Sequence, residues 1–308
     1  MLEGRVSSTP PIAPASDLAA TSSPAVDPPP PGTVERWAWD YILATDLPTK
    51  LSPPAPPSRW EASPPPRRLR APGRPAALVI SPHAAKTPGP EALRSPSRRA
   101  QLVHTFLHHE LQAAELMAWA LLAFPDRPRA FRGGLVHIAL DEVRHMGFYA
   151  DHLATLGHRF GDFPVRDWFW ERVPSAPTAA HFVAVMGVGF EGANLDHTAR
   201  FADRFRAVGD EAGARLQERV GEEEIPHVRF ALRWLRRWTR DLPVSRPDAD
   251  TPSPRAPDFT TWIRHLPPPL SPILMRGRPM NRESRRRSGL TDPFLEELES
   301  WSERAPGS

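Results

Sequence analysis

The uneven distribution of proline restricts what this chain can fold into more than any other feature of its sequence. Of its 40 prolines, 22 lie in residues 1–100, 6 in residues 101–242 and 12 in residues 243–308. Proline lacks a backbone hydrogen-bond donor and breaks the interiors of helices and sheets. We therefore expect a helix-permissive middle between two proline-rich flanks, and we expect the function to reside in the middle.

The proline-rich flanks predict extended chain rather than further globular domains. Residues 1–33 have the composition of a disordered tail, and residues 34–94 that of an extended arm with a short amphipathic helix over Val34–Leu47. Residues 243–308 predict a proline- and arginine-rich arm with a short terminal helix. Large apolar side chains in these arms need burial, so we expect both arms to wrap the middle domain; these side chains are Trp60, Trp262, Phe294 and Trp301.

The composition also excludes several classes of function. The chain has no cysteine, so it cannot form disulfides or metal sites built on thiolates. The first residues lack the apolar stretch of a signal peptide, and the longest apolar run, Phe182–Phe190, is too short to span a bilayer. We expect a soluble, cytoplasmic protein with no membrane partner.

The charge of the chain comes almost entirely from arginine. There are 37 arginines and 2 lysines, with a formal net charge of +3. We interpret this bias as compositional rather than as a nucleic-acid footprint, and we expect the sharpest basic cluster, Arg285–Arg287, to be a solvated tail segment.

Four long helices are expected between Ser95 and Arg240. Ser95-Pro96 and Asp126-Arg127-Pro128 are helix starts, and glycines at 157 and 209 are helix ends. Each predicted helix has about 25 to 30 residues, or about 40 Å. Only the second and third are joined by a long connection, residues 158–177. The sequence thus predicts an all-α fold, a ferritin-like four-helix bundle with one long crossover over residues 95–242.

Acidic and histidine residues recur inside the apolar pattern of these helices. The second and fourth helices each contain Glu-x-x-His, and the first and third each contain a solitary Glu, separated from its partner motif by 32 and 33 residues. A bundle needs this set to hold two metal ions, and four carboxylates balance two divalent cations. Carboxylate and imidazole ligands suit iron or manganese. The expected ligands are Glu110, Glu142, His145, Glu191, Glu224 and His227.

Some assignments near this set have alternatives. Glu115 competes with Glu110, but it lies about 140° further around the helix, so both cannot face one centre. Glu110 is favoured because it continues the apolar stripe of its helix. Tyr149 and His152 follow His145 at helical spacing and, with Glu115, are candidates for a supporting shell.

Pro226 lies inside the second Glu-x-x-His motif. It removes one helical hydrogen bond, at a cost of about 3 kcal/mol in an ordinary helix. Either the helix is bulged there, or this half of the site is altered. His227 is accordingly the ligand that the sequence supports least.

Several stretches resemble the bacterial ferritin-like proteins catalogued as domain of unknown function 455. These stretches are PGRP at 72–75, HHELQAAEL at 108–116, FPDRPRAF at 124–131, LDEVRHMGFYADHLATLG at 140–157, FEGANLD at 190–196, EEIPHV at 223–228 and NRESRRRSGL at 281–290. Glu110-x-x-Ala113 is also similar to the first-helix ligand motif of rubrerythrin-like and hydroxylase proteins. The resemblance implies a di-metal carboxylate bundle, for example a hydroxylase of the tRNA-hydroxylase kind.

Three functions compete at this point. The leading hypothesis is an oxidoreductase that activates dioxygen or peroxide with two iron ions, or iron and manganese. The others are iron oxidation, storage or peroxide scavenging, and a non-enzymatic scaffold with a degenerate metal site. We expect a small-molecule substrate or tRNA, which Arg276–Arg287 could contact, together with an electron donor, and a monomer or dimer.

Overall fold

The computed structural model describes residues 27–83, 88–240 and 258–302, and this part of the chain is all-helical. It contains no β-strand, only an isolated bridge between Ile80 and Val165. Most of the tail expected to be disordered lies outside the described residues, and so do residues 241–257, which cover the end of the expected bundle and the start of the C-terminal arm. No helix in the described ranges combines the length and the apolar character that crossing a membrane requires.

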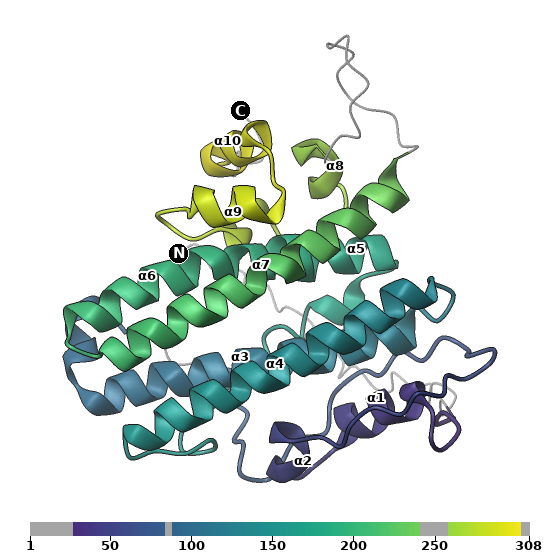
Figure 1. Ribbon diagram of the computed structural model, residues 1–308, viewed down its shortest axis with the longest axis horizontal. Helices are drawn as coiled ribbons and strands as arrows, with labels where there is room; N and C mark the ends of the chain where they lie inside the picture. The colour runs from purple at the N-terminus through teal and green to yellow at the C-terminus, as the bar shows by residue number, and fades with distance from the viewer. Residues whose placement is uncertain (1–26, 84–87, 241–257, 303–308) are drawn as a thin grey trace, which may run out of the picture.

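Four long helical segments make up the middle of the chain (Figure 1). Three are regular: α3 (Pro96–Ala123), α4 (Arg129–Thr155) and α7 (Glu211–Thr239). The third segment in sequence is continuous but has three parts: α5 (Ala179–Val183), a π-helix (Ala184–Glu191) and α6 (Gly192–Ala207). The expected end signals are present, since Gly157 and Gly209 have φ of 78° and 79°, and Asp210 caps α7 by accepting from the Gly213 amide.

The long segments pack as two hairpins that face each other. α3 lies along α4 and α6 lies along α7, joined by short connections at 124–128 and 208–210. α4 also contacts α7, while the 23-residue connection from Leu156 to Thr178, with a 3-10 turn at Val173–Ser175, joins the hairpins. The buried apolar residues form two clusters. Glu110 of α3 and the Glu-x-x-His motifs of α4 and α7 lie at the boundary between these clusters.

The π-helix is the main departure from regular helix geometry. It ends at Glu191 and contains Gly187 and Gly189. A Cβ atom on Gly187 would overlap Ala231 of α7, and one on Gly189 would lie 2.5 Å from the Met275 sulfur. Glycine therefore allows this segment to approach α7 and the C-terminal arm closely.

The N-terminal arm packs on α3 through α1 (Val34–Leu43), followed by α2 (Leu47–Leu51) and a 3-10 turn at Pro90–Arg94. The helix expected over Val34–Leu47 ends earlier, at Leu43, and a separate short helix begins at Leu47. The second begins anew because Asp46 caps it, accepting from the Thr49 amide, with proline in its first turn.

The C-terminal arm contains α8 (Phe259–Ile263), a 3-10 turn at Pro272–Met275, α9 (Arg282–Ser288) and α10 (Asp292–Ser300). Trp262 and Phe294 are buried, whereas Trp60 and Trp301 are half-buried.

The expectation that Arg285–Arg287 is a solvated tail is wrong for Arg285. This arginine is fully buried, and its Nε and Nη2 atoms donate to Asp196 of α6 at 3.0 and 2.8 Å. The exposed Arg286 and Arg287 pair with Asp292 and Glu222. Neither the helical periodicity nor the composition of the sequence could predict the burial of Arg285, because it depends on a carboxylate 89 residues away.

Candidate metal centre

The six residues expected as metal ligands are all buried in the middle of the two hairpins. α3 supplies Glu110, the π-helix supplies Glu191, and α4 and α7 each supply a Glu-x-x-His pair. Exposed fractions run from 0% for Glu142, His145 and Glu224 to 5% for Glu110 and Glu191. Side chains this polar are buried only where something compensates their charge.

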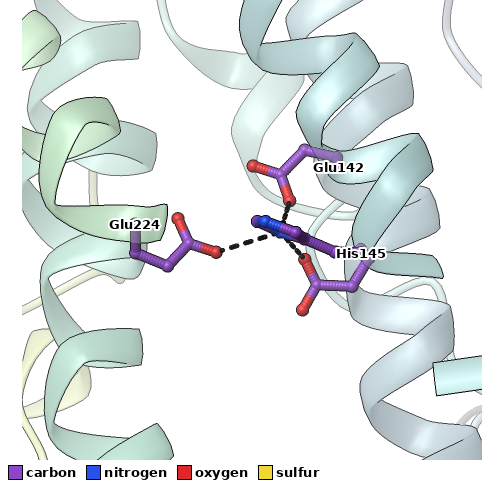
Figure 2. A group of neighbouring side chains, drawn as sticks. Glu142, His145 and Glu224 are labelled. Atoms are coloured by element: carbon purple, nitrogen blue, oxygen red, sulfur yellow. Dashed lines mark hydrogen bonds and ion pairs between the residues drawn. The ribbon is translucent and has the colours of Figure 1, made fainter. Parts of the chain in front are cut away.

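Four of these side chains form a compact group. One ligand atom from each of Glu110, Glu142, His145 and Glu224 lies within 4.8 Å of the others, so this group could hold a metal ion. His145 Nδ1 lies 3.2 Å from Glu142 Oε2, 3.5 Å from Glu110 Oε2 and 3.6 Å from Glu224 Oε1. Figure 2 shows the carboxylates of Glu142 and Glu224 converging on the His145 ring from two helices.

His227 adjoins this group and repeats the geometry of His145. Its Nδ1 atom lies 2.9 Å from Glu224 Oε2 and 3.2 Å from Glu142 Oε1. The carboxylates of Glu142 and Glu224 thus lie between the two imidazoles. Pro226 does not displace His227, because α7 continues through it and its side chain is exposed.

Glu191 is not one of the four side chains of the compact group. Burial raises the pKa of Glu191 well above its ordinary value, and the nearby carboxylates of Glu224 and Glu142 raise it further. Its Oε1 atom is buried and unpaired within the described residues. A buried carboxylate oxygen that has no hydrogen-bond donor is suited to bind a cation, above all when other carboxylates lie nearby.

The two carboxylates nearest His145 have pKa values shifted in opposite directions. Burial would raise the pKa of Glu142, but hydrogen bonds to His145 and His227 lower it below its ordinary value. Burial raises the pKa of Glu110 well above its ordinary value. Burial would lower the pKa of His145, but hydrogen bonds to Glu110 and Glu142 raise it well above the ordinary value. Burial acts on His227 in the same way, and the charge of Glu224 and a bond to Asp141 outweigh it. The raised pKa values favour the protonated forms of Glu110, His145 and His227, so metal binding to these groups would release protons.

The second nitrogen of each imidazole pairs with the opposite motif. His145 Nε2 lies 3.0 Å from Glu223 Oε2, and His227 Nε2 lies 3.2 Å from Asp141 Oδ2. Each acceptor is the acidic residue directly before the Glu of the other Glu-x-x-His. A hydrogen on Nε2 fixes the ring and leaves Nδ1 free to bind a metal.

Arg144 joins the two acceptors at the surface. Its guanidinium donates to Asp141 at 2.5 Å and to Glu223 at 2.7 Å. Sequence reasoning named no acceptor for either histidine. The signal that could have found them is the acidic residue preceding both motifs, in Asp141-Glu142 and Glu223-Glu224. Asn194 was also missed; its side chain donates to Glu224 Oε1 at 3.2 Å.

The structure places Glu115 in a different network. Its Oε1 accepts from Lys50 at 2.7 Å and from Arg74 at 2.6 Å, and its Oε2 accepts from Trp170 at 2.8 Å. Lys50 is fully buried and belongs to the N-terminal arm, whereas Trp170 belongs to the long connection. Glu115 therefore fastens both segments to α3, and Glu110 is the α3 carboxylate in the ligand group.

The two remaining candidates for a supporting shell differ in position. Tyr149 is buried, its hydroxyl accepts from Gln217 at 3.1 Å, and after burial the charge of Glu110 is the main cause that raises its pKa. Tyr149 is thus buried on α4, four residues after His145. His152 instead lies 3.2 Å from Asp210, the cap of α7.

Together these features describe an all-helical protein with a buried carboxylate–histidine group that could bind metal. The chain belongs to the family described as "Protein of unknown function (DUF455)", which matches residues 35–296. An uncharacterized protein of Haemophilus influenzae is 26% identical over 146 residues, 44% of this chain and 50% of that protein. The chain thus matches about half the length of this relative. No solved structure shows significant similarity to the chain.

Proposed function

We propose that the protein is a ferritin-like di-metal carboxylate oxidoreductase that activates dioxygen or peroxide on a substrate. Two iron ions, or iron and manganese, would bind through Glu110, Glu142, His145, Glu191, Glu224 and His227. The observation that carries this proposal is the pseudo-symmetric pair of Glu-x-x-His motifs, with both Nδ1 atoms directed at Glu142 and Glu224. The hairpin arrangement of the four long segments supports the ferritin-like assignment.

The donor set fits two divalent cations. Four carboxylates would neutralise them, the imidazoles would be neutral ligands, and Glu191 Oε1 would gain the partner that it lacks. Bound iron would supply electron transfer to an oxidant.

The protein's own residues would position and insulate the centre. Asp141 and Glu223 hold the hydrogen on the Nε2 atoms and so fix both rings, while Arg144 holds these two acceptors together. The apolar clusters on either side exclude water. Electrons would come from an external donor.

Metal analysis tests this proposal. We expect about two iron or manganese ions per chain in purified protein, and loss of both in Glu142→Ala. The control is Glu222→Ala on α7, an exposed residue paired with Arg287, which should keep the full metal content. Stoichiometric iron in Glu142→Ala would contradict the proposal. Protein that takes up no iron(II) under anaerobic conditions would instead favour a scaffold.

A further inference from the structure

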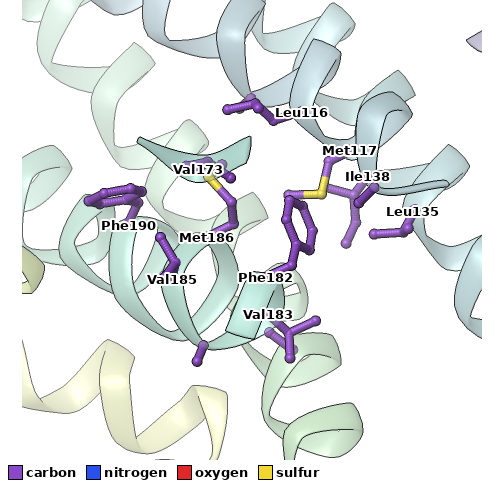
Figure 3. Packing of buried hydrophobic residues seen from close by; sticks show 14 of the residues in the cluster. Leu116, Met117, Leu135, Ile138, Val173, Phe182, Val183, Val185, Met186 and Phe190 are labelled. Atoms are coloured by element: carbon purple, nitrogen blue, oxygen red, sulfur yellow. The ribbon is translucent and has the colours of Figure 1, made fainter. Parts of the chain in front are cut away.

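Glu191 is the one candidate ligand that lies outside a regular α-helix, because it ends the π-helix Ala184–Glu191. π-helices are rare and occur mostly at functional sites. All residues of this one are buried, and Figure 3 shows Val185, Met186 and Phe190 among the apolar side chains of the core. A buried segment with this geometry needs contacts that favour it over an ordinary α-helix.

The C-terminal arm contributes a hydrogen bond at the start of the π-helix. The indole Nε1 atom of Trp262 on α8 donates to the carbonyl of Ala184 at 2.9 Å. Trp262 is fully buried and packs against Phe259 and Phe294 of the same arm. Because a buried donor is costly to leave unpaired, this bond fixes the first residue of the π-helix relative to the arm.

The same arm contacts the end of the π-helix at two glycines. A Cβ atom on Gly189 would lie 2.5 Å from the Met275 sulfur, and one on Gly192, directly after Glu191, would lie 3.3 Å from Arg285 Nη1. Met275 and Arg285 are fully buried, and Arg285 Nη2 donates to the Met275 carbonyl at 3.0 Å. The arm therefore packs directly against the backbone on both sides of Glu191.

Asp196 of α6 anchors this part of the arm. Its carboxylate accepts from the guanidinium of Arg285 and, at 2.7 Å each, from the backbone amides of Gly277 and Asn281. The side chains of Asp196 and Arg285 are both fully buried. The arm cannot move away from α6 without leaving a buried charge unpaired, so it is a rigid support for the π-helix.

The geometry of the π-helix determines where the Glu191 side chain points. A π-helix closes its hydrogen bonds over one residue more than an α-helix does. A change to α-helix would therefore rotate Glu191 about the helix axis relative to α5. Since Glu191 lies outside the compact group of four side chains, its position bears on the second ion of the proposed pair.

We propose that Trp262, Met275 and Arg285 are positioning residues for Glu191, because the C-terminal arm holds the π-helix that carries this carboxylate. This inference rests on the proposed di-metal function. It adds that the four long segments alone do not complete the ligand set, since the geometry of the third depends on residues from outside the bundle.

Trp262→Phe tests the proposal, because it keeps a buried aromatic ring and removes the donor to Ala184. Anaerobic iron(II) titration of the full chain measures the affinity for each ion. The affinity for the second ion should fall about tenfold or more, in the same direction as in Glu191→Gln. The affinity for the first ion should stay at the wild-type value. An unchanged second affinity in Trp262→Phe would overturn the proposal.

Trp119→Phe is the matched control. Trp119 of α3 is also fully buried, and its indole donates to a backbone carbonyl at 3.0 Å, but that carbonyl belongs to Leu69 of the N-terminal arm. This variant should lose stability as Trp262→Phe does and retain both ions. Equal loss of the second ion in the two variants would assign Trp262 a merely structural role and overturn the proposal.

Crystal structures of the metal-free protein separate this inference from the proposed function. The Glu191 carboxylate should be displaced by about 1 Å or more in Trp262→Phe relative to the wild type. If that variant does not fold, Gly189→Ala, whose Cβ atom would overlap the Met275 sulfur, should displace Glu191 likewise. An unmoved Glu191 would overturn the positioning role even in a chain that binds two ions. A displaced Glu191 in a chain whose wild type takes up no metal would refute the di-metal function alone.

Discussion

The Nε2 atom of His227 on α7 lies 3.2 Å from Oδ2 of Asp141 on α4, and His145 forms the converse pair with Glu223. Each imidazole of the candidate centre is therefore oriented by the hairpin that does not carry it. The carboxylate partner of a metal-binding histidine fixes its ring and its tautomer. Asp141 and Glu223 are not among the candidate ligands, but each should affect metal binding through the histidine that it orients.

Removal of either acceptor should weaken metal binding. We expect Asp141→Ala and Glu223→Ala each to lower the affinity for iron(II) about 10- to 100-fold. Competition with a chelator measures the affinity. Asp151→Ala, an exposed position on α4, should leave it unchanged, and so should Glu222→Ala on α7. Wild-type affinity in Asp141→Ala would show that the ring of His227 needs no such partner.

The two α3 carboxylates should separate metal binding from stability. Glu110→Gln should abolish binding of at least one metal ion and leave the metal-free fold intact, because it replaces a buried carboxyl beside other carboxylates. Glu115→Gln should keep the metal content of folded protein but lower the free energy of unfolding by about 3 kcal/mol, since it leaves the buried Lys50 poorly paired. Denaturant titration and elemental analysis of both variants test this. Loss of metal in Glu115→Gln together with loss of stability in Glu110→Gln would contradict the prediction.

Replacement of Pro226 should stabilise the protein. Proline in a helix interior lacks one hydrogen bond and costs about 3 kcal/mol, partly offset by the restricted unfolded chain. Pro226→Ala should therefore raise the free energy of unfolding by about 1–2 kcal/mol, measured by urea titration. Metal content should be unchanged, since His227 already faces the centre. Loss of metal in Pro226→Ala would mean that the proline shapes the site.

His104 should make stability depend on pH. Burial lowers its pKa to about 4, and its Nε2 accepts from the Gly161 amide, which requires the neutral ring. The unfolded chain binds this proton at about pH 6.5. The stability that neutral His104 contributes is therefore fully present above pH 6.5. It is lost as the pH falls toward 4, and the loss is about 3 kcal/mol in total.

The test of this pH dependence is urea titration of metal-free protein at pH 7 and pH 4.5. His104→Gln should lose less stability between these values than wild type. His83→Gln, at an exposed position, should behave as wild type. An identical pH slope in His104→Gln would contradict the prediction.

The long helices and the ligand group were accessible from sequence because their signals are local. Helical period, caps and the Glu-x-x-His spacing depend on neighbours within a few turns, and helix ends such as Gly157 and Gly209 matched the structure. The π-helix before Glu191 was not predicted, because its geometry depends on the close approach of Gly187 to Ala231. The partners of Glu115 and Arg285 were missed for a related reason, since they come from segments 41–89 residues away.

The 23-residue connection between α4 and α5 has a consequence for how this gene could be rearranged. It is the one long link between the two halves of the described bundle, and each half carries two carboxylates and one imidazole of the centre. A break in this link would leave each fragment with only half of the candidate ligands and would separate each imidazole from its acidic partner. Only fragments that reassociate would bring the two halves of the candidate site, and both crossed pairs, together again.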